Sequence, residues 1–294
     1  MAQAATQPYL IRPFTDGMRS PVIAPLTRGL LGIPTFLFAA STATAFSWTI
    51  DPPLTAAVLG ANYWGSVALA IFASRQLFWS QGRVSISVAL AFAPITTVAT
   101  FIHLELFHFD SSGFTLFITW FWVIAYSIYP VQLGILLAKQ LRTAGVDPPR
   151  TVTLPGWVRG ILLVHAIVLV PMGVLMFAAP GVAESPWPWE VPALSARALA
   201  AWVLAFGVLA AHSFIENDFD RVKVGLWSYP VLGVLHVIAL VRFGEVVQWE
   251  ESGAWAYLGF IASTFVLGAY GIANRKHARK EWIAPKHGEA TFRA

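Results

Sequence analysis

The sequence predicts an all-α protein, a polytopic transmembrane helical bundle of about eight spans arranged as two parallel four-span repeats. The first observation is the composition: 57% of the 294 residues are hydrophobic and 12% are charged, whereas soluble domains carry about 25% charged residues. The second is that short charged loops separate apolar runs of about 20 residues, the length that crosses a bilayer core as a helix. The third is a similarity between the two halves of the chain.

Apolar segments follow one another along the whole chain, and most are flanked by arginine or lysine. The first opens with RGLLGIP at Arg28 and contains Pro34, which a membrane helix tolerates near its end. The second ends at Arg75, and the third begins after Arg83. The predicted spans are residues 28–46, 54–74, 84–104, 114–138, 160–178, 194–215, 224–243 and 254–274.

Basic residues alternate between the loops and so predict an orientation. They occur in the N-terminal segment, after the second, fourth and sixth spans, and in the C-terminal tail, while the other loops are acidic or neutral. Because cytoplasmic loops carry the excess of arginine and lysine, both termini should be cytoplasmic, in the cytoplasmic (inner) membrane of a bacterium. The expected divisions are a cytoplasmic N-terminal segment (1–27), a first repeat (28–140), a basic cytoplasmic loop (141–158), a second repeat (159–274) and a basic cytoplasmic tail (275–294).

The N-terminal segment is polar and contains no small-residue cleavage site, so it is expected to be retained and not to act as a signal peptide. Tryptophans gather at the opposite, outer ends of the spans. Amphipathic rings favour the headgroup region of a bilayer. The sequence therefore predicts an interfacial position for Trp48, Trp187, Trp189, Trp249 and Trp255.

Residues 54–113 match residues 194–253 without a gap, at an offset of 140. The matches include turn and charged residues, which similar apolar composition alone does not supply. Upstream, Arg28 and Gly29 match Arg159 and Gly160 at a shorter offset. Four spans per copy predict the same orientation for both copies, related by a pseudo-twofold axis along the membrane normal. The matched pairs are Leu54/Leu194, Ala56/Ala196, Leu59/Leu199, Ala61/Ala201, Arg83/Lys223, Glu105/Glu245, Phe109/Trp249, Asp110/Glu250, Ser112/Ser252 and Gly113/Gly253.

The turn and helix WPWEVPALSARALAAW begins at Trp187 and is followed by a charged loop, an apolar span and a segment with the spacing E-x-x-x-W-x-x-S-G. This arrangement resembles a group of uncharacterised bacterial integral membrane proteins. The resemblance is best in the second half. It supports the architecture and implies no activity, substrate or catalytic residue.

Several chemistries are disfavoured. Zero cysteines exclude disulfides, thiolate nucleophiles and iron–sulfur clusters. The net charge of +4 comes from loops where the positive-inside bias puts basic residues, so nucleic acid is not an expected partner. A rhodopsin would need a lysine in the middle of a span, and Lys139 lies at the end of one. No nucleotide-binding or protease motif is present, so a non-enzymatic protein is expected.

Histidines within the spans are candidate cofactor ligands. His165, His212 and His236 lie in the fifth, sixth and seventh predicted spans. Neutral imidazoles at different depths could ligate haem b or a pigment. The alternative is that each imidazole forms a hydrogen bond to a neighbouring helix.

A metal site is the second candidate, formed by His103, Glu105 and His108 at the outer end of the third span. Glu-x-x-His puts both side chains one helical turn apart, a spacing found in di-iron bundles. The matching position of the second repeat is Gln248, so the symmetric partner is missing. A solvated rim is the alternative.

The third candidate is a clamp formed by Arg197, Glu245 and Arg242. Arg197 should be costly in a span unless it snorkels or pairs with a carboxylate such as Glu190 or Glu245. Such a pair would fix the WPW turn, or it could contact an anionic ligand or lipid headgroup.

Two function classes remain. The first is a non-enzymatic membrane protein that binds or transports a small or lipid-like molecule, or is an accessory subunit of a membrane complex. Its partners would be the lipid bilayer and either further copies of the chain or other membrane subunits. The second is a histidine-liganded haem or pigment protein that takes part in membrane electron transfer.

Overall fold

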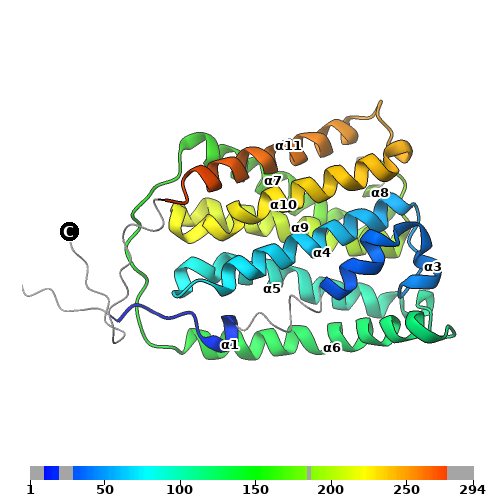
Figure 1. The fold of residues 1–294 in the computed structure, drawn as a ribbon, viewed down its shortest axis with the longest axis horizontal. Coiled ribbons are helices and arrows are strands. Elements are labelled where there is room, and N and C mark those ends of the chain that lie inside the picture. Colours follow the sequence, from blue (N-terminus) through cyan, green and yellow to red (C-terminus); the bar gives the residue numbers. More distant parts are fainter. Residues whose placement is uncertain (1–9, 20–28, 184–186, 277–294) are drawn as a thin grey trace, which may run out of the picture.

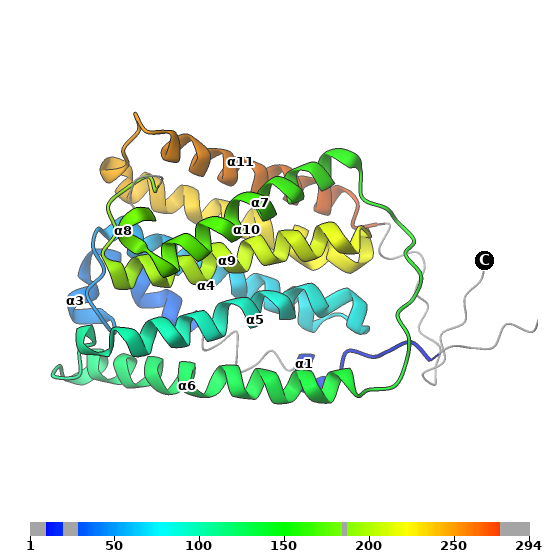
Figure 2. The same cartoon turned by 180° about the vertical axis from the view of Figure 1, so that it is seen from behind.

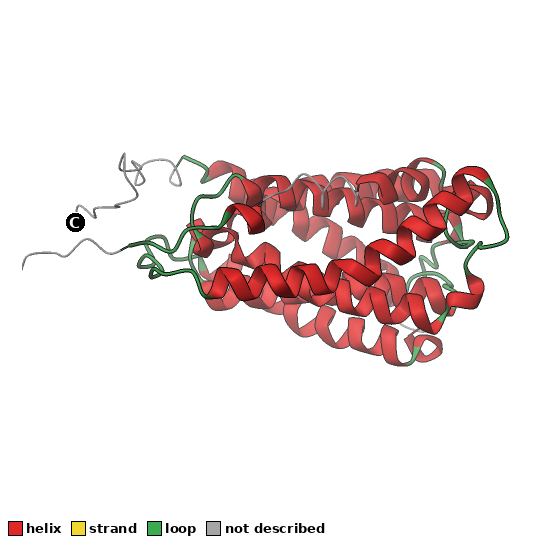
Figure 3. Cartoon of the chain, turned by 90° about the horizontal axis from the view of Figure 1, so that it is seen from below, coloured by secondary structure: helices red, strands yellow, loops and turns green. Residues whose placement is uncertain are grey.

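The computed structural model describes residues 10–19, 29–183 and 187–276. In these residues every named element is helical (Figure 3), and extended backbone pairs only in two isolated bridges. Seven helices are long and apolar enough to cross a membrane. They are α4 (Pro53–Ser74), α5 (Trp79–Ile102), α6 (Gly113–Leu141), α7 (Gly156–Ala178), α9 (Ala193–Glu216), α10 (Phe219–Phe243) and α11 (Ser252–Ala273). The architecture is that of a multi-pass membrane protein, which confirms the all-α class.

The long helices run side by side along the long axis of the molecule (Figures 1 and 2). α4 packs against α10, α5 against α9, α7 against α9, and α10 against α11. α4 and α9 are mostly buried, whereas α6 and α7 lie at the edges. The exposed face of α6 carries large apolar side chains, which match hydrocarbon and not water. They are Phe114, Phe117, Trp120, Ile124, Ile128, Val131 and Ile135.

The two ends of the bundle differ in composition. One end, called the tryptophan end below, is formed by residues 46–52, 103–112, 187–192 and 244–251. The other, called the basic end, is formed by residues 10–19, 75–78, 142–155 and 217–218. The longest helix, α6, has 29 residues and so extends about 44 Å, enough to cross a bilayer core of about 30 Å.

The first predicted span, 28–46, is not one continuous helix. From residue 29 it contains a helical turn, a π-helix η1 (Ile33–Leu37), a 3₁₀ turn η2 (Ala39–Ser41) and the short α3 (Thr42–Ala45). Pro34 lacks the N–H that a regular helix uses, and the backbone leaves the helical region at Phe38, with φ −107° and ψ 34°. Eight continuous spans are therefore not confirmed, and the described residues contain seven.

The other predicted spans agree with the observed helices to within a few residues, except at two starts. α5 begins at Trp79 and α10 at Phe219, each five residues before the predicted start. At α10 the Asp218 side chain caps the helix by accepting the Arg221 N–H at 3.2 Å. The charged first turn of α10 is buried and paired, Lys223 with Asp220. A prediction from apolar residues alone therefore misses the charged start of α10.

Residues 10–19 pack onto the basic end instead of forming a free polar segment. Ile11 bridges to Val146, and Phe14 is 2% exposed. The Gln140 side chain of α6 accepts from the Thr15 N–H at 2.9 Å and donates to the Pro13 carbonyl at 2.9 Å. These contacts fix the short helix α1 (Asp16–Arg19) beside α6. The rest of the predicted N-terminal segment and residues 277–294 of the predicted tail lie outside the described residues.

Trp48 and Trp189 lie at the tryptophan end, but their side chains are 2% and 1% exposed and so point into the bundle. Each indole N–H has a partner in the core: Trp48 donates to Ser195 Oγ at 3.3 Å and Trp189 to Thr55 Oγ1 at 2.8 Å. Because a buried indole N–H needs such a partner, the two side chains fit the interior. Trp249 and Trp255 are exposed, as predicted.

Candidate functional site

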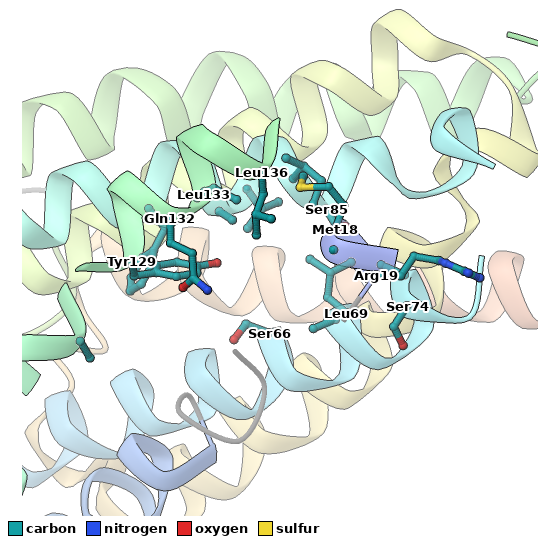
Figure 4. A pocket seen from close by; sticks show the side chains of 18 of the residues that line it. Met18, Arg19, Ser66, Leu69, Ser74, Ser85, Tyr129, Gln132, Leu133 and Leu136 are labelled. Carbon is teal, nitrogen blue, oxygen red and sulfur yellow. The ribbon is translucent and has the colours of Figure 1, made fainter. Parts of the chain in front are cut away.

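The described structure contains a cavity of about 370 Å³ lined mainly by α4, α5 and α6, in the half of the bundle nearer the basic end. Figure 4 shows its lining side chains. This volume lies within the usual range of small-molecule sites, about 300–1,000 Å³. None of the histidines in the described residues lines it.

Each wall of the cavity is one face of a helix. On α4 the lining residues recur at helical spacing, Ser66, Leu69, Ala70 and Ala73. α5 contributes Ser85, Val88, Ala89 and Phe92, and α6 contributes residues from Phe121 to Leu136. Small side chains on α4 and α5 leave the space that larger ones would fill. The cavity therefore follows from the sequence of these faces.

The polar groups of the cavity are few. The Ser66 and Ser85 hydroxyls donate to carbonyls of their own helices, to Tyr63 at 2.7 Å and Gly82 at 2.7 Å. Their oxygen lone pairs remain as acceptors. Figure 4 places Tyr129 and Gln132 together on the α6 wall, apart from Met18 and Arg19. The cavity is thus mainly apolar, with a small number of polar groups.

An aromatic group closes the cavity toward the middle of the bundle. Phe92 lies with its ring centroid 4.0 Å from that of Trp202 and 5.9 Å from that of Tyr126. Tyr126 and Tyr63 share a hydrogen bond between their hydroxyls at 2.8 Å. At the basic end the cavity is lined instead by Phe14, Gly17, Met18 and Arg19. One end is therefore aromatic and the other includes a cation.

The predicted cofactor ligand His236 is held in a hydrogen-bonded group between helices. Its Nε2 lies 2.9 Å from Asn62 Oδ1 and its Nδ1 lies 2.7 Å from the Tyr257 hydroxyl. Because the Asn62 oxygen only accepts, Nε2–H donates to it and Nδ1 accepts from Tyr257. Both ring nitrogens are used, so axial ligation of haem would break a hydrogen bond.

The other two candidate haem ligands are also engaged. His165 Nε2 lies 2.7 Å from Ser263 Oγ, and its buried Nδ1 has no partner. His212 bonds Ser87 Oγ at 3.0 Å and Glu216 at 3.2 Å. The ring of Phe260 packs against both His165 and His236. This arrangement fits hydrogen bonding between helices, the alternative to haem ligation, and leaves the Nδ1 of His165 without a partner.

The predicted metal residues do not converge. Glu105 is exposed and lies 3.8 Å from His103. His108 faces the loop before α4, with Nδ1 2.9 Å from the Phe46 carbonyl and Nε2 3.2 Å from Thr49 Oγ1. Among the described residues, no three His, Asp or Glu side chains lie close enough to hold a metal. The 3₁₀ turn η3 (Leu104–Leu106) separates the side chains that a continuous helix would align.

Arg197 does not pair with Glu190 or Glu245. It donates through Nε to the Phe177 carbonyl at 3.0 Å and through Nη1 to His103 Nε2 at 2.6 Å. Within the described residues no carboxylate forms an ion pair with it. His103 must accept, so its ring is neutral. Burial and the Arg197 charge lower the pKa of His103 below its ordinary value.

Arg242 also contacts carbonyls and not Glu245, which is exposed. Its guanidinium donates to the Phe36 carbonyl and, at 3.2 Å, to the Leu37 carbonyl. These carbonyls lie at the end of η1, where helix carbonyls lack internal partners. Arg197 and Arg242 are therefore clamps on the ends of helical segments, and the predicted three-residue group does not form.

The basic end contains a buried ionic cluster that the sequence did not predict. Glu216, 3% exposed, pairs with Arg83 and with Arg221 at 3.0 Å, and Arg83 also pairs with Asp147. Asp218 Oδ2 accepts from the backbone of Thr151 at 2.7 Å. The cluster joins α5, α9, α10 and the loop that contains Asp147 and Thr151. Its carboxylates are compensated, so it acts as a structural junction.

The sequence reasoning also missed the cavity. Ser66 on α4 and Ser85 on α5 line the cavity and were not among the candidate site residues. The signal that could have identified the cavity is the run of small residues on α4 and α5 at helical spacing, opposite the polar side chains of Tyr129 and Gln132 on α6.

Comparison of the chain with protein-family models, with curated proteins and with solved structures finds no match.

Proposed function

We propose that the protein is a non-enzymatic integral membrane protein, built of two like-oriented four-span units, that binds a lipid-like molecule in the cavity between α4, α5 and α6. The first unit contains residues 10–141 and the second residues 150–273. The basic end is cytoplasmic in this proposal, following the positive-inside bias. The cavity is the observation that carries the binding function.

Reciprocal contacts support the two-unit organisation. Trp48 of the first unit donates to Ser195 of the second, and Trp189 of the second donates to Thr55 of the first. The tryptophans are matched at an offset of 141 and their acceptors at an offset of 140. A pseudo-twofold axis between the units would relate the two bonds to each other. The packing of α4 on α10 and of α5 on α9 has the same reciprocity.

Backbone hydrogen bonds extend the match between the two units toward the N-terminal end of each unit. The Trp79 N–H donates to the Arg12 carbonyl at 3.1 Å, and the Phe219 N–H donates to the Val152 carbonyl at 2.7 Å. Both members of each bond are 140 positions from their counterparts. These bonds favour a nearly constant offset between the matched residues of the two units over the shorter offset that the match of Arg28 with Arg159 suggests. The first unit then begins at residues 10–15, with α1 as the counterpart of the start of α7.

The two units differ where the cavity lies. In the second unit, α7 packs along α9 and its His165 ring lies 6.3 Å from the ring of Tyr229. The first-unit counterpart of Tyr229 is Ala89, and that of Phe206 is Ser66; both counterparts line the cavity. Small residues therefore replace aromatic ones, and the resulting space is suited to an apolar ligand.

Photolabelling tests the proposal. The protein in phosphatidylcholine nanodiscs is incubated with a long-chain alcohol that carries a diazirine, irradiated, digested and mapped by mass spectrometry. Labels are expected on the cavity segments 66–73 and 85–92. Ala70→Phe or, from the opposite wall, Ala125→Phe should remove this labelling by filling the cavity.

Ala262→Phe is the matched control, because Ala262 is exposed on α11 and distant from the cavity wall. It should leave the labelling unchanged. Labelling spread evenly over the lipid-facing side chains of α6 and α11, and insensitive to both cavity variants, would contradict the proposed binding site.

A further inference from the structure

We infer that the ligand of the cavity is a single-chain amphiphile with an anionic headgroup, such as an ionised fatty acid, whose headgroup binds Arg19. This inference rests on the proposed binding of a lipid-like molecule. In it, the chain lies along α4, α5 and α6 and points toward Phe92, Tyr126 and Trp202.

Arg19 lines the basic end of the cavity and has one donor without a partner. Its Nε is buried and has no partner, while its Nη2 pairs with Asp16, whose side chain is 93% exposed. A pair with such an exposed carboxylate contributes little. An arginine presents several donors in a fork that matches a carboxylate or phosphate. A ligand anion would satisfy Nε and could compete with Asp16.

The surroundings of this end are positively charged. Arg75 follows the lining residue Ser74, and Lys139 lies three positions after the lining residue Leu136. Both are exposed, and within the described residues neither forms an ion pair. Asp16 is the acidic residue of α1. Charge complementarity therefore favours an anion over a cation or an uncharged headgroup.

The rest of the lining favours a hydrocarbon chain. Arg19 is the one charged residue among the described lining residues, so at the opposite end these residues offer no charged partner. From Ser66 to Ser74 the α4 wall is about 12 Å long, at 1.5 Å per residue. A cavity of about 370 Å³ suits one chain better than the two chains of a phospholipid.

Competition binding tests the headgroup. Nanodiscs of phosphatidylcholine that contain the wild-type protein are equilibrated with radiolabelled dodecanoate at alkaline pH, where the probe is ionised, and challenged with unlabelled dodecanoate or dodecanol. Empty nanodiscs give the background from partitioning. The wild-type protein should prefer dodecanoate by about tenfold, the effect of a hydrogen bond to a charged group.

Arg19→Gln should abolish that preference and leave the affinity for dodecanol unchanged. Arg275→Gln is the matched control, because it removes an exposed cation that does not line the cavity, and it should keep the preference. Equal affinity of the wild-type protein for both probes would overturn the anionic headgroup while the proposed cavity remains. A preference that survives Arg19→Gln would overturn the role of Arg19.

Two further comparisons distinguish a failure of the proposed binding function from a failure of the single-chain inference. If neither probe binds above the background of empty nanodiscs and of Ala70→Phe, the proposed function itself fails. Nanodiscs that contain phosphatidylglycerol should leave dodecanoate binding intact. Complete displacement by that lipid would assign the site to an anionic phospholipid and overturn the single-chain inference.

Discussion

Asn62, His236 and Tyr257 form the polar contact that crosses between α4, α10 and α11 in the middle of the bundle. In hydrocarbon an unsatisfied polar group is costly, so these residues should hold one another in a fixed arrangement. The group explains a histidine in the seventh predicted span without a cofactor. Its role is to join the helices of the two proposed units.

A double-mutant cycle tests this pairing. Asn62→Leu and His236→Leu should each destabilise the protein, and the double variant should lose less than their sum. The coupling should be about 0.6–1.7 kcal/mol, the range measured for hydrogen bonds between membrane helices. Reversible unfolding in mixed micelles measures it. Strictly additive losses would mean that the hydrogen bond at 2.9 Å contributes nothing.

His103 should make the stability of the folded protein depend on pH. Its pKa is lowered in the folded protein, so the native state binds fewer protons than the unfolded state, whose histidine titrates near 6.5. The stability contribution is therefore fully present above the ordinary histidine pKa and is lost as the pH falls from there through the lowered pKa of the folded state. His103→Gln, which keeps an acceptor for Arg197, should reduce this acid sensitivity. Thermal unfolding at a series of pH values measures it, and an unchanged acid response would count against the contact.

At the scale of elements, α7 and α9 approach closely because two glycines face each other's helices. A Cβ on Gly173 would lie 2.6 Å from the Leu204 nitrogen, and one on Gly207 would lie 2.7 Å from Val170 Cγ2. Small residues allow such backbone approach in membranes. The position of α7 along α9 follows from this contact.

Gly173→Val should separate the two helices and cost about 1–3 kcal/mol, as overpacking of a core does. Gly259→Val is the control, because a Cβ there would meet nothing within 4 Å. Thermal unfolding in detergent compares the two variants. If both lose the same stability, helix propensity and not the close approach is the cause.

The sequence predicted the seven long helices well, because a run of apolar residues at bilayer length has few other interpretations. It failed for residues 28–46, where Pro34 and the backbone change at Phe38 break a segment of suitable length. It also failed for side-chain partners. The surroundings of His108, Arg197 and Arg242 depend on how distant helices pack, and the pairings expected from the sequence are not those observed.

At the scale of the whole molecule, the two proposed units give a definite topology. The natural chain has no cysteine, so single cysteines can report exposure. Asp110→Cys and Glu250→Cys at the tryptophan end should react with an impermeant maleimide in intact cells. Ala144→Cys at the basic end should react only after permeabilisation. Labelling of Asp110→Cys and Glu250→Cys from opposite sides would contradict like-oriented units.

The cavity lies where small residues of α4 and α5, Ser66 and Ala89, take the places of the aromatic Phe206 and Tyr229 of the second unit. The most direct measurement of its occupancy is native mass spectrometry of the protein released from its own membranes. The wild-type protein and Ala262→Phe should each carry one bound lipid-like molecule, and Ala70→Phe should carry none. Equal occupancy of all three proteins, or no bound molecule on the wild-type protein, would contradict a lipid-like ligand in this cavity.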